Sequence, residues 1–151
     1  MTEKKRTFTF NFSPLFVDKV AAGAKLQTVR AWRKDGKVPR PGDRVRLYAG
    51  LRTRKARLLV DSVVVECFPV TMNLSDDEHP LLVSNGIRLH RGEATSFAQL
   101  DGFPGFAAMA DWFKRTHGEE FDGFCVRWRR PLVHTCESRP YCEACDAGDA
   151  F

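Results

Sequence analysis

Three residues whose side chains can do chemistry lie close together near the start of the chain. Lys25 supplies a flexible ammonium, Thr28 a hydroxyl and Arg30 a fixed guanidinium. Gly23, just before them, permits the chain to reverse after a helix. If the segment after Lys25 is extended, residues 28 and 30 share one face and point into the same cleft. Such a group can bind an anion or take part in catalysis. The alternative is a structural role, with Arg30 paired to an acid, Thr28 suited to a strand and Lys25 solvated.

Hydrophobic periodicity predicts the elements that would position these residues. Thr7–Phe12 alternates polar and aromatic residues, which predicts a strand with one buried face. Ser13 and Pro14 fit the start of a short helix that Gly23 ends. Asn85-Gly86 between two apolar runs predicts a hairpin. The remaining predicted elements are strands at 26–32, 44–48, 56–68, 81–83, 87–89 and 124–129, and helical pieces at 95–100 and 104–117.

This order of elements predicts an α+β fold that is mainly β. The strands follow one another closely, and helices occur only near the start and late in the chain. We therefore expect a small, mixed, closed or nearly closed β-barrel of about five to seven strands. The short N-terminal helix and the longer helix before the last strand should pack at its ends or side.

Composition predicts one domain followed by an appendage. The chain has 151 residues, of which 43% are hydrophobic, which suffices for one core. After Arg130 the sequence becomes acidic and rich in cysteine, so we expect a domain over 1–130 and a tail over 131–151. The net charge is +5, and the tail contributes negatively to it. The basic body favours polyanionic partners such as nucleic acid, although many small domains are basic only for solubility.

Two further features concern location and cofactors. The first residues, Met1–Arg6, contain no long apolar stretch, so neither a signal peptide nor a membrane span is expected, and the expected compartment is the cytoplasm.

In the tail, the spacing of four residues fits ligands of a structural zinc ion, and the alternative is a plain thiol-bearing tail. These four residues are His134, Cys136, Cys142 and Cys145. No other cofactor is expected.

Basic loops around the expected barrel are candidates for phosphate contacts with RNA or another single-stranded nucleic acid. Trp32 could stack a base, and ordinary packing is the alternative for this aromatic residue. The cationic candidates are Arg33, Arg40, Arg52, Arg54 and Lys55, with Lys34 and Lys37 beside them.

Three segments resemble motifs of ASCH domains, in the same order and with similar spacing. Residues 23–30 match Gly-x-Lys-x-x-Thr-x-Arg, residues 41–45 resemble a Gly-Asp turn, and residues 98–103 resemble an acid-Gly-Phe segment. The resemblance covers about residues 7–130. It implies a PUA-like β-barrel, which agrees with the pattern of strands.

Within that family, the chain is similar in part to N(4)-acetylcytidine amidohydrolases. The resemblance implies that Lys25, Thr28 and Asp101 are catalytic, although Asp101 stands where the amidohydrolase pattern has Glu. A desolvated Lys25 would deprotonate Thr28 or a water, a carboxylate would orient the amine, and Arg30 would steady an oxyanion or the base. The expected ligand is then a modified pyrimidine nucleoside or RNA. A non-catalytic RNA-binding module and a ribonuclease of the same family remain as alternatives.

Overall fold

Seven strands and three helices make up residues 5–130, the part of the chain that the computed structural model describes. The strands are β1 (Thr7–Phe12), β2 (Gln27–Ala31), β3 (Arg44–Ala49), β4 (Arg57–Asn73), β5 (Leu81–Ser84), β6 (Ile87–Arg88) and β7 (Glu120–Trp128). The helices are α1 (Pro14–Ala21), α2 (Arg91–Leu100) and α3 (Phe106–His117). The predicted α+β class with mainly β structure is therefore confirmed.

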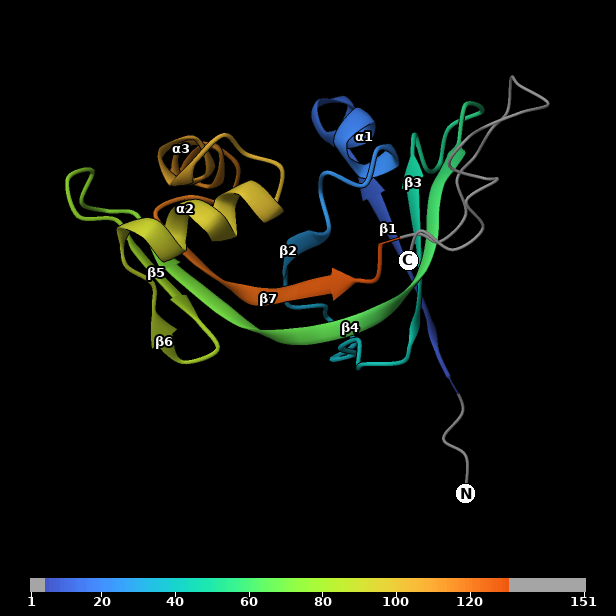
Figure 1. Ribbon diagram of the computed structural model, residues 1–151, viewed down its shortest axis with the longest axis horizontal. Helices are drawn as coiled ribbons and strands as arrows, with labels where there is room; N and C mark the ends of the chain where they lie inside the picture. Colours follow the sequence, from blue (N-terminus) through green and yellow to red (C-terminus); the bar gives the residue numbers. More distant parts are fainter. Residues whose placement is uncertain (1–4, 131–151) are drawn as a thin grey trace, which may run out of the picture.

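The sheet is organised around the long strand β4, which pairs antiparallel with β3 over its first part and with β7 over its second. On the far side of β3 lies β1, in parallel, and on the far side of β7 lies β2, in antiparallel pairing. The hairpin β5–β6 pairs with the end of β4. In Figure 1, β4 and β7 curve together beneath the helices, with α2 and α3 over one half and α1 over the other.

The backbone ladders among the described residues do not close the sheet into a barrel. β1 pairs only with β3, and β2 only with β7, so each is an edge. A side chain links these two edges, because Arg30 Nη2 on β2 donates to the carbonyl of Asn11 on β1 at 2.7 Å. The closed barrel expected from the sequence is thus not confirmed, and the free edges of β1 and β2 are linked through a guanidinium.

Local sequence signals account for most element boundaries. Ser13 and Pro14 begin α1 as predicted, and the chain leaves the helix through Gly23, whose φ of 77° is the left-handed region that glycine adopts without strain. Asn85 and Gly86 both have positive φ in the hairpin turn. Helix α2 begins four residues before its predicted start, because the Glu93 carboxylate accepts the His90 backbone N–H and supports an earlier first turn.

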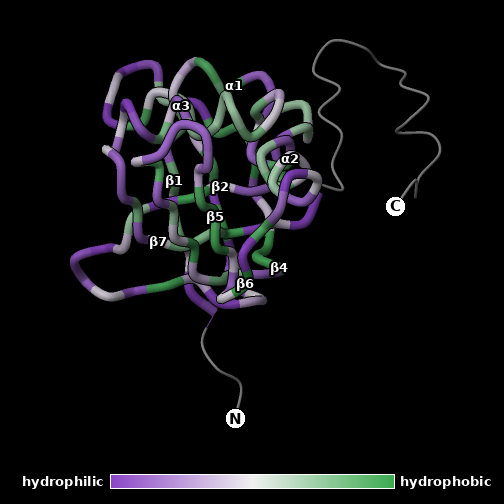
Figure 2. Tube along the Cα trace, turned by 90° about the vertical axis from the view of Figure 1, so that its left-hand side faces the viewer, coloured by the Kyte–Doolittle hydropathy of each residue, from purple (hydrophilic) through white to green (hydrophobic). Residues whose placement is uncertain are grey.

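The core lies between the inner face of the sheet and the helices. The aromatic residues of β1 alternate with exposed polar ones and point inward, and Val20 of α1 and Met109 of α3 are fully buried in the same core. Apolar stretches of the strands gather in the middle of the body, and the loops outside are hydrophilic (Figure 2). None of the helices within residues 5–130 is both long and apolar enough to cross a membrane.

Candidate functional site

A cavity of about 310 Å³ lies between β2, α1 and α3. This volume is at the lower end of the range of roughly 300–1,000 Å³ that small-molecule sites occupy. All four residues of the predicted cluster line it, from two segments more than seventy positions apart: Lys25, Thr28, Arg30 and Asp101. The predicted convergence of these side chains on one cleft is therefore what the structure shows, and their chemical roles stay predictions.

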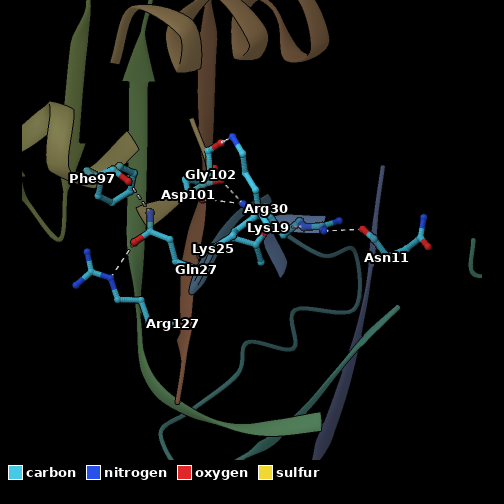
Figure 3. A network of polar contacts seen from close by, with 10 residues as sticks. Asn11, Lys19, Lys25, Gln27, Arg30, Phe97, Asp101, Gly102 and Arg127 are labelled. Atoms are coloured by element: carbon cyan, nitrogen blue, oxygen red, sulfur yellow. Dashed lines mark hydrogen bonds and ion pairs between the residues drawn. The ribbon is translucent and has the colours of Figure 1, made fainter. Parts of the chain in front are cut away.

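Lys25 lies at the floor of the cavity, between α1 and β2. Its side chain is almost fully buried, and its ammonium is 4.7 Å from the ring centre of Phe16 and 5.7 Å from that of Phe12. Nζ donates to the backbone carbonyl of Asp101 and lies 3.4 Å from the Asp101 carboxylate oxygen Oδ1 (Figure 3). The two aromatic faces and the carboxylate are what allow a lysine to be buried here.

Asp101 is held in place by the turn that ends α2. Gly102, next to it, has a φ of 94°, and a Cβ at this position would lie 3.2 Å from Lys25 Cδ and 3.3 Å from Phe16 Cδ1. The glycine therefore allows both the turn and the close approach of the lysine stem. A second lysine, Lys19 of α1, donates to the Gly102 carbonyl, so two ammoniums reach consecutive carbonyls of one turn (Figure 3).

Burial pushes both members of the Lys25–Asp101 pair toward their neutral forms. Desolvation raises the pKa of Asp101 to about 6, against the opposing attraction of the Lys25 and Arg30 charges. Desolvation likewise lowers the pKa of Lys25 from its ordinary 10.5, although Asp101 opposes this. Asp101 Oδ1 is buried and makes no hydrogen bond to the described residues beyond its ion pair with Lys25. Burial therefore brings the pKa values of the two groups closer together than they are in water.

Thr28 and Arg30 lie on the same face of β2, as their spacing predicted. Arg30 Nε donates to Thr28 Oγ1 at 3.0 Å, and the guanidinium lies over the rings of Phe10 and Phe12 at 5.4 and 5.0 Å. Because Oγ1 accepts from a cation, the hydroxyl proton of Thr28 is left to be given to a base, and a developing negative charge on Oγ1 would be stabilised. An activated hydroxyl also requires a base within hydrogen-bond reach. Among the described residues Lys25 Nζ donates to the Asp101 carbonyl and makes no hydrogen bond to Thr28 Oγ1, so the predicted Lys25–Thr28 contact is not present in this structure.

Gln27 is a buried polar residue of this region that the sequence analysis did not single out. It is fully buried, its Nε2 donates to the carbonyl of Phe97 at 3.2 Å, and its Oε1 accepts from Arg127 Nε at 2.9 Å (Figure 3). The polar side chain of Gln27 also holds the pKa of Asp101 lower than burial alone would. Its partners lie 70 and 100 positions away, so no local pattern could have found it.

Helix α3 supplies an aromatic wall to the cavity, which the sequence analysis also missed. Trp112, Phe113, Thr116 and His117 line it, and their spacing places them on one side of the helix. The sequence analysis predicts a helix at 104–117 and places none of these four residues in the site. The available signal was an aromatic stripe continuing to a histidine at the end of the helix.

The other predicted binding residues lie outside the cavity. Trp32 is 43% exposed and packs on Phe124 at 5.4 Å between ring centres, and Arg33 is paired with Asp35 at 3.0 Å. The rest are exposed side chains of loops before β3 and β4: Arg40, Arg52, Arg54 and Lys55. The structure therefore divides the predicted residues into a buried cluster and a set of surface cations.

The predicted zinc ligands of the tail, His134, Cys136, Cys142 and Cys145, lie outside the described residues. Within residues 5–130, no group of three or more His, Cys, Asp and Glu side chains could hold a metal ion. Burial raises the pKa of Cys67 to about 11 and that of Cys125 well above its usual value, which is typical of unreactive thiols.

The geometry of the site has to carry the functional argument by itself. No family model, no curated protein and no solved structure matches this chain.

Proposed function

We propose that this chain is an ASCH-like domain of the PUA-like class, and that its cavity binds a pyrimidine nucleoside with an exocyclic amide. The site would hydrolyse an amide of the N(4)-acetylcytidine type, in which water adds across the C–N bond and cytidine and acetate are released. The observation that carries the proposal is that the buried Lys25–Asp101 pair and a threonine hydroxyl held by Arg30 line the same cavity of about 310 Å³.

Each group has a chemical role in such a reaction. The neutral amine of Lys25 would accept the proton of Thr28 or of a water that attacks the carbonyl carbon, and Asp101 would hold the amine in place. Arg30 uses two of its five N–H groups on Thr28 and Asn11, so others are available for the carbonyl oxygen as it gains negative charge. The proton on Lys25 would then pass to the departing nitrogen.

The direct test is incubation of the protein with N(4)-acetylcytidine, with chromatography of the products. We expect cytidine and acetate in equal amounts from the wild type. Failure to consume either the nucleoside or acetylated RNA at any pH from 6 to 9 would contradict the enzymatic proposal and leave the cavity as a base-recognition pocket.

The same pair predicts an acidic limb in the pH profile of kcat. When the Lys25–Asp101 pair carries one proton, one of the two groups is free to act as a base, whichever group that is. When the pair carries two protons, neither group can act as a base. Because burial raises the pKa of Asp101 to about 6, the second proton binds as the pH falls through that region. We expect log kcat to fall with a slope of one below about pH 6 and to be flat above pH 7. A kcat independent of pH from 5 to 8 would rule the pair out as the base.

A specific observation also favours a second function, the binding of single-stranded nucleic acid. Arg52, Arg54 and Lys55 are exposed in the loop before β4, and within residues 5–130 none of them forms an ion pair. Arg52 also has a φ of 74°, a costly conformation for a residue other than glycine. Unpaired cations on a loop are suited to phosphate contacts.

Replacing Arg52, Arg54 and Lys55 together with alanine should weaken oligonucleotide binding to a similar extent for all sequences. If three phosphate contacts are lost, the slope of log K against log salt concentration should fall by about 2. Fluorescence anisotropy between low and moderate salt measures this, with Lys114→Ala as control because Lys114 is already paired with Asp77. An unchanged slope would show that the loop does not contact the phosphates.

A further inference from the structure

The cavity has two chemically different walls, and one residue of the second wall is unexplained by the proposed reaction. The polar wall holds the buried pair with Thr28 and Arg30, and the aromatic wall comes from α3 with Phe12 and Phe16. The mouth is formed by lining residues that are exposed, among them Asn11, Ser13 and His117. His117 is therefore the ionisable residue that the aromatic wall places at the entrance.

The imidazole of His117 is oriented by three neighbouring rings. Its ring centre is 5.3 Å from that of Phe113 at an interplanar angle of 30°, 6.0 Å from that of Trp112 and 5.0 Å from that of Phe121. None of the residues from 5 to 130 forms a hydrogen bond or ion pair with its ring nitrogens. The ring is thus fixed by packing, while its polar edge is left for a ligand.

The cavity needs an acceptor that the polar wall does not supply freely. While they are charged, Lys25 and Arg30 can donate hydrogen bonds but cannot accept them. Thr28 Oγ1 already accepts from Arg30, and the Asp101 carboxylate is buried against Lys25. Ser13 and Thr116 add exposed hydroxyls, whose hydrogen bonding does not change with pH. A neutral imidazole presents an accepting nitrogen as well as a donor.

We propose that His117 is a specificity-determining residue, whose neutral imidazole accepts a hydrogen bond from an N–H on the edge of a planar base that packs against the rings of α3. The proposal rests on the proposed function, since it names how the same cavity selects its ligand. The donor to this imidazole nitrogen would be the exocyclic amide N–H of the ligand. A nucleobase without an N–H on that edge would bind less well.

Protonation should switch this contact off. Partial burial and the charge of Arg30 lower the pKa of His117 below its usual 6.5, so the neutral ring predominates at pH 7. The charged groups of the cavity are Arg30 and the Lys25–Asp101 pair, which has no net charge while it holds one proton. On α3 itself, Lys114 is paired with Asp77 and Arg115 with Asp111, and β7 presents the ring of Phe121 to the imidazole.

The test is the KM for N(4)-acetylcytidine of wild type and His117→Phe between pH 5.5 and 8. Phenylalanine keeps the ring packing and removes the hydrogen bond, so KM at pH 7.5 should rise about three- to tenfold while kcat changes little. The wild-type KM should rise as the pH falls, and the variant KM should not. His79→Phe, in a surface loop remote from the cavity, should match the wild type.

The outcomes separate this inference from the proposed function. A wild type that neither binds nor hydrolyses the nucleoside overturns both. A wild type that turns over, with a His117→Phe variant of unchanged KM or unchanged pH dependence of KM, overturns the role of His117 alone. A variant that loses kcat at constant KM would also contradict it, because it would place the histidine in the chemical step.

Discussion

Replacing Lys25 with methionine should lower kcat for N(4)-acetylcytidine about 10²- to 10⁴-fold, the usual contribution of a positioned acid or base. Methionine keeps the length of the buried stem beside Phe16 and removes the amine. Thr28→Val is a second variant that leaves the Lys25–Asp101 pair intact, and it should cost a similar factor if the hydroxyl is the nucleophile. Initial rates under saturating nucleoside measure both.

A matched control is Lys19→Met, because Lys19 reaches the neighbouring carbonyl of the same turn but does not line the cavity. Its kcat should stay within about threefold of the wild-type value, as expected when only one hydrogen bond at the surface is lost. Full activity of Lys25→Met would contradict the proposed mechanism. Full activity of Thr28→Val alone would leave Lys25 activating a water instead.

Breaking the buried pair should also have the largest effect on stability. Lys25→Met leaves the Asp101 carboxylate buried without its partner, and removal of one member of a buried ion pair typically costs about 3–5 kcal/mol. Asp101→Asn leaves the Lys25 ammonium in the same position. In the double variant neither charge remains, so the loss in free energy of unfolding should be smaller than the sum of the two single losses.

Urea unfolding of the four proteins at pH 7 measures this cycle, with circular dichroism to confirm that each variant is folded. The pH dependence has a defined sign. Because the pKa of Asp101 is raised from 3.8 to about 6 in the folded state, the folded protein binds the proton first as the pH falls, so this group makes folding more favourable between about pH 6 and pH 4. Lys25→Met removes the attraction that lowers the pKa of Asp101, so the carboxyl of the variant takes up its proton at a higher pH than that of the wild type. The cost of Lys25→Met should therefore be smaller at pH 5 than at pH 7. Strictly additive losses would show that the two charges are not coupled.

Local patterns predicted the elements of this fold well, because their signals lie within a few residues. Ser13-Pro14 and Gly23 bound α1, and the turn at Asn85-Gly86 requires positive φ at both positions. What local patterns could not predict is which strands are neighbours. The gap between β1 and β2 depends on pairings between segments far apart in the chain, so the sequence could suggest a barrel but not where its ladders stop.

The candidate site could likewise be predicted where its signal is local, and not where it depends on contacts between distant segments. The period of two along β2 placed Thr28 and Arg30 on one face, and the structure joins them at 3.0 Å. Asp101 entered the prediction only through the resemblance to a family, since nothing near it in the sequence marks it as a partner of Lys25. His117 was missed because a helical stripe of aromatic residues is equally typical of a core face, and only packing shows that its end opens into a cavity.

The central claim is that the cavity, and not the basic loops, is where this protein binds a pyrimidine nucleoside. Two-dimensional amide NMR of the labelled protein, titrated with N(4)-acetylcytidine, tests it most directly. We predict shifts that saturate and that cluster at Thr28, Arg30, Asp101 and His117, with no response from residues 52–55. Shifts confined to the basic loops, or no saturable shift at the cavity residues, would contradict the account.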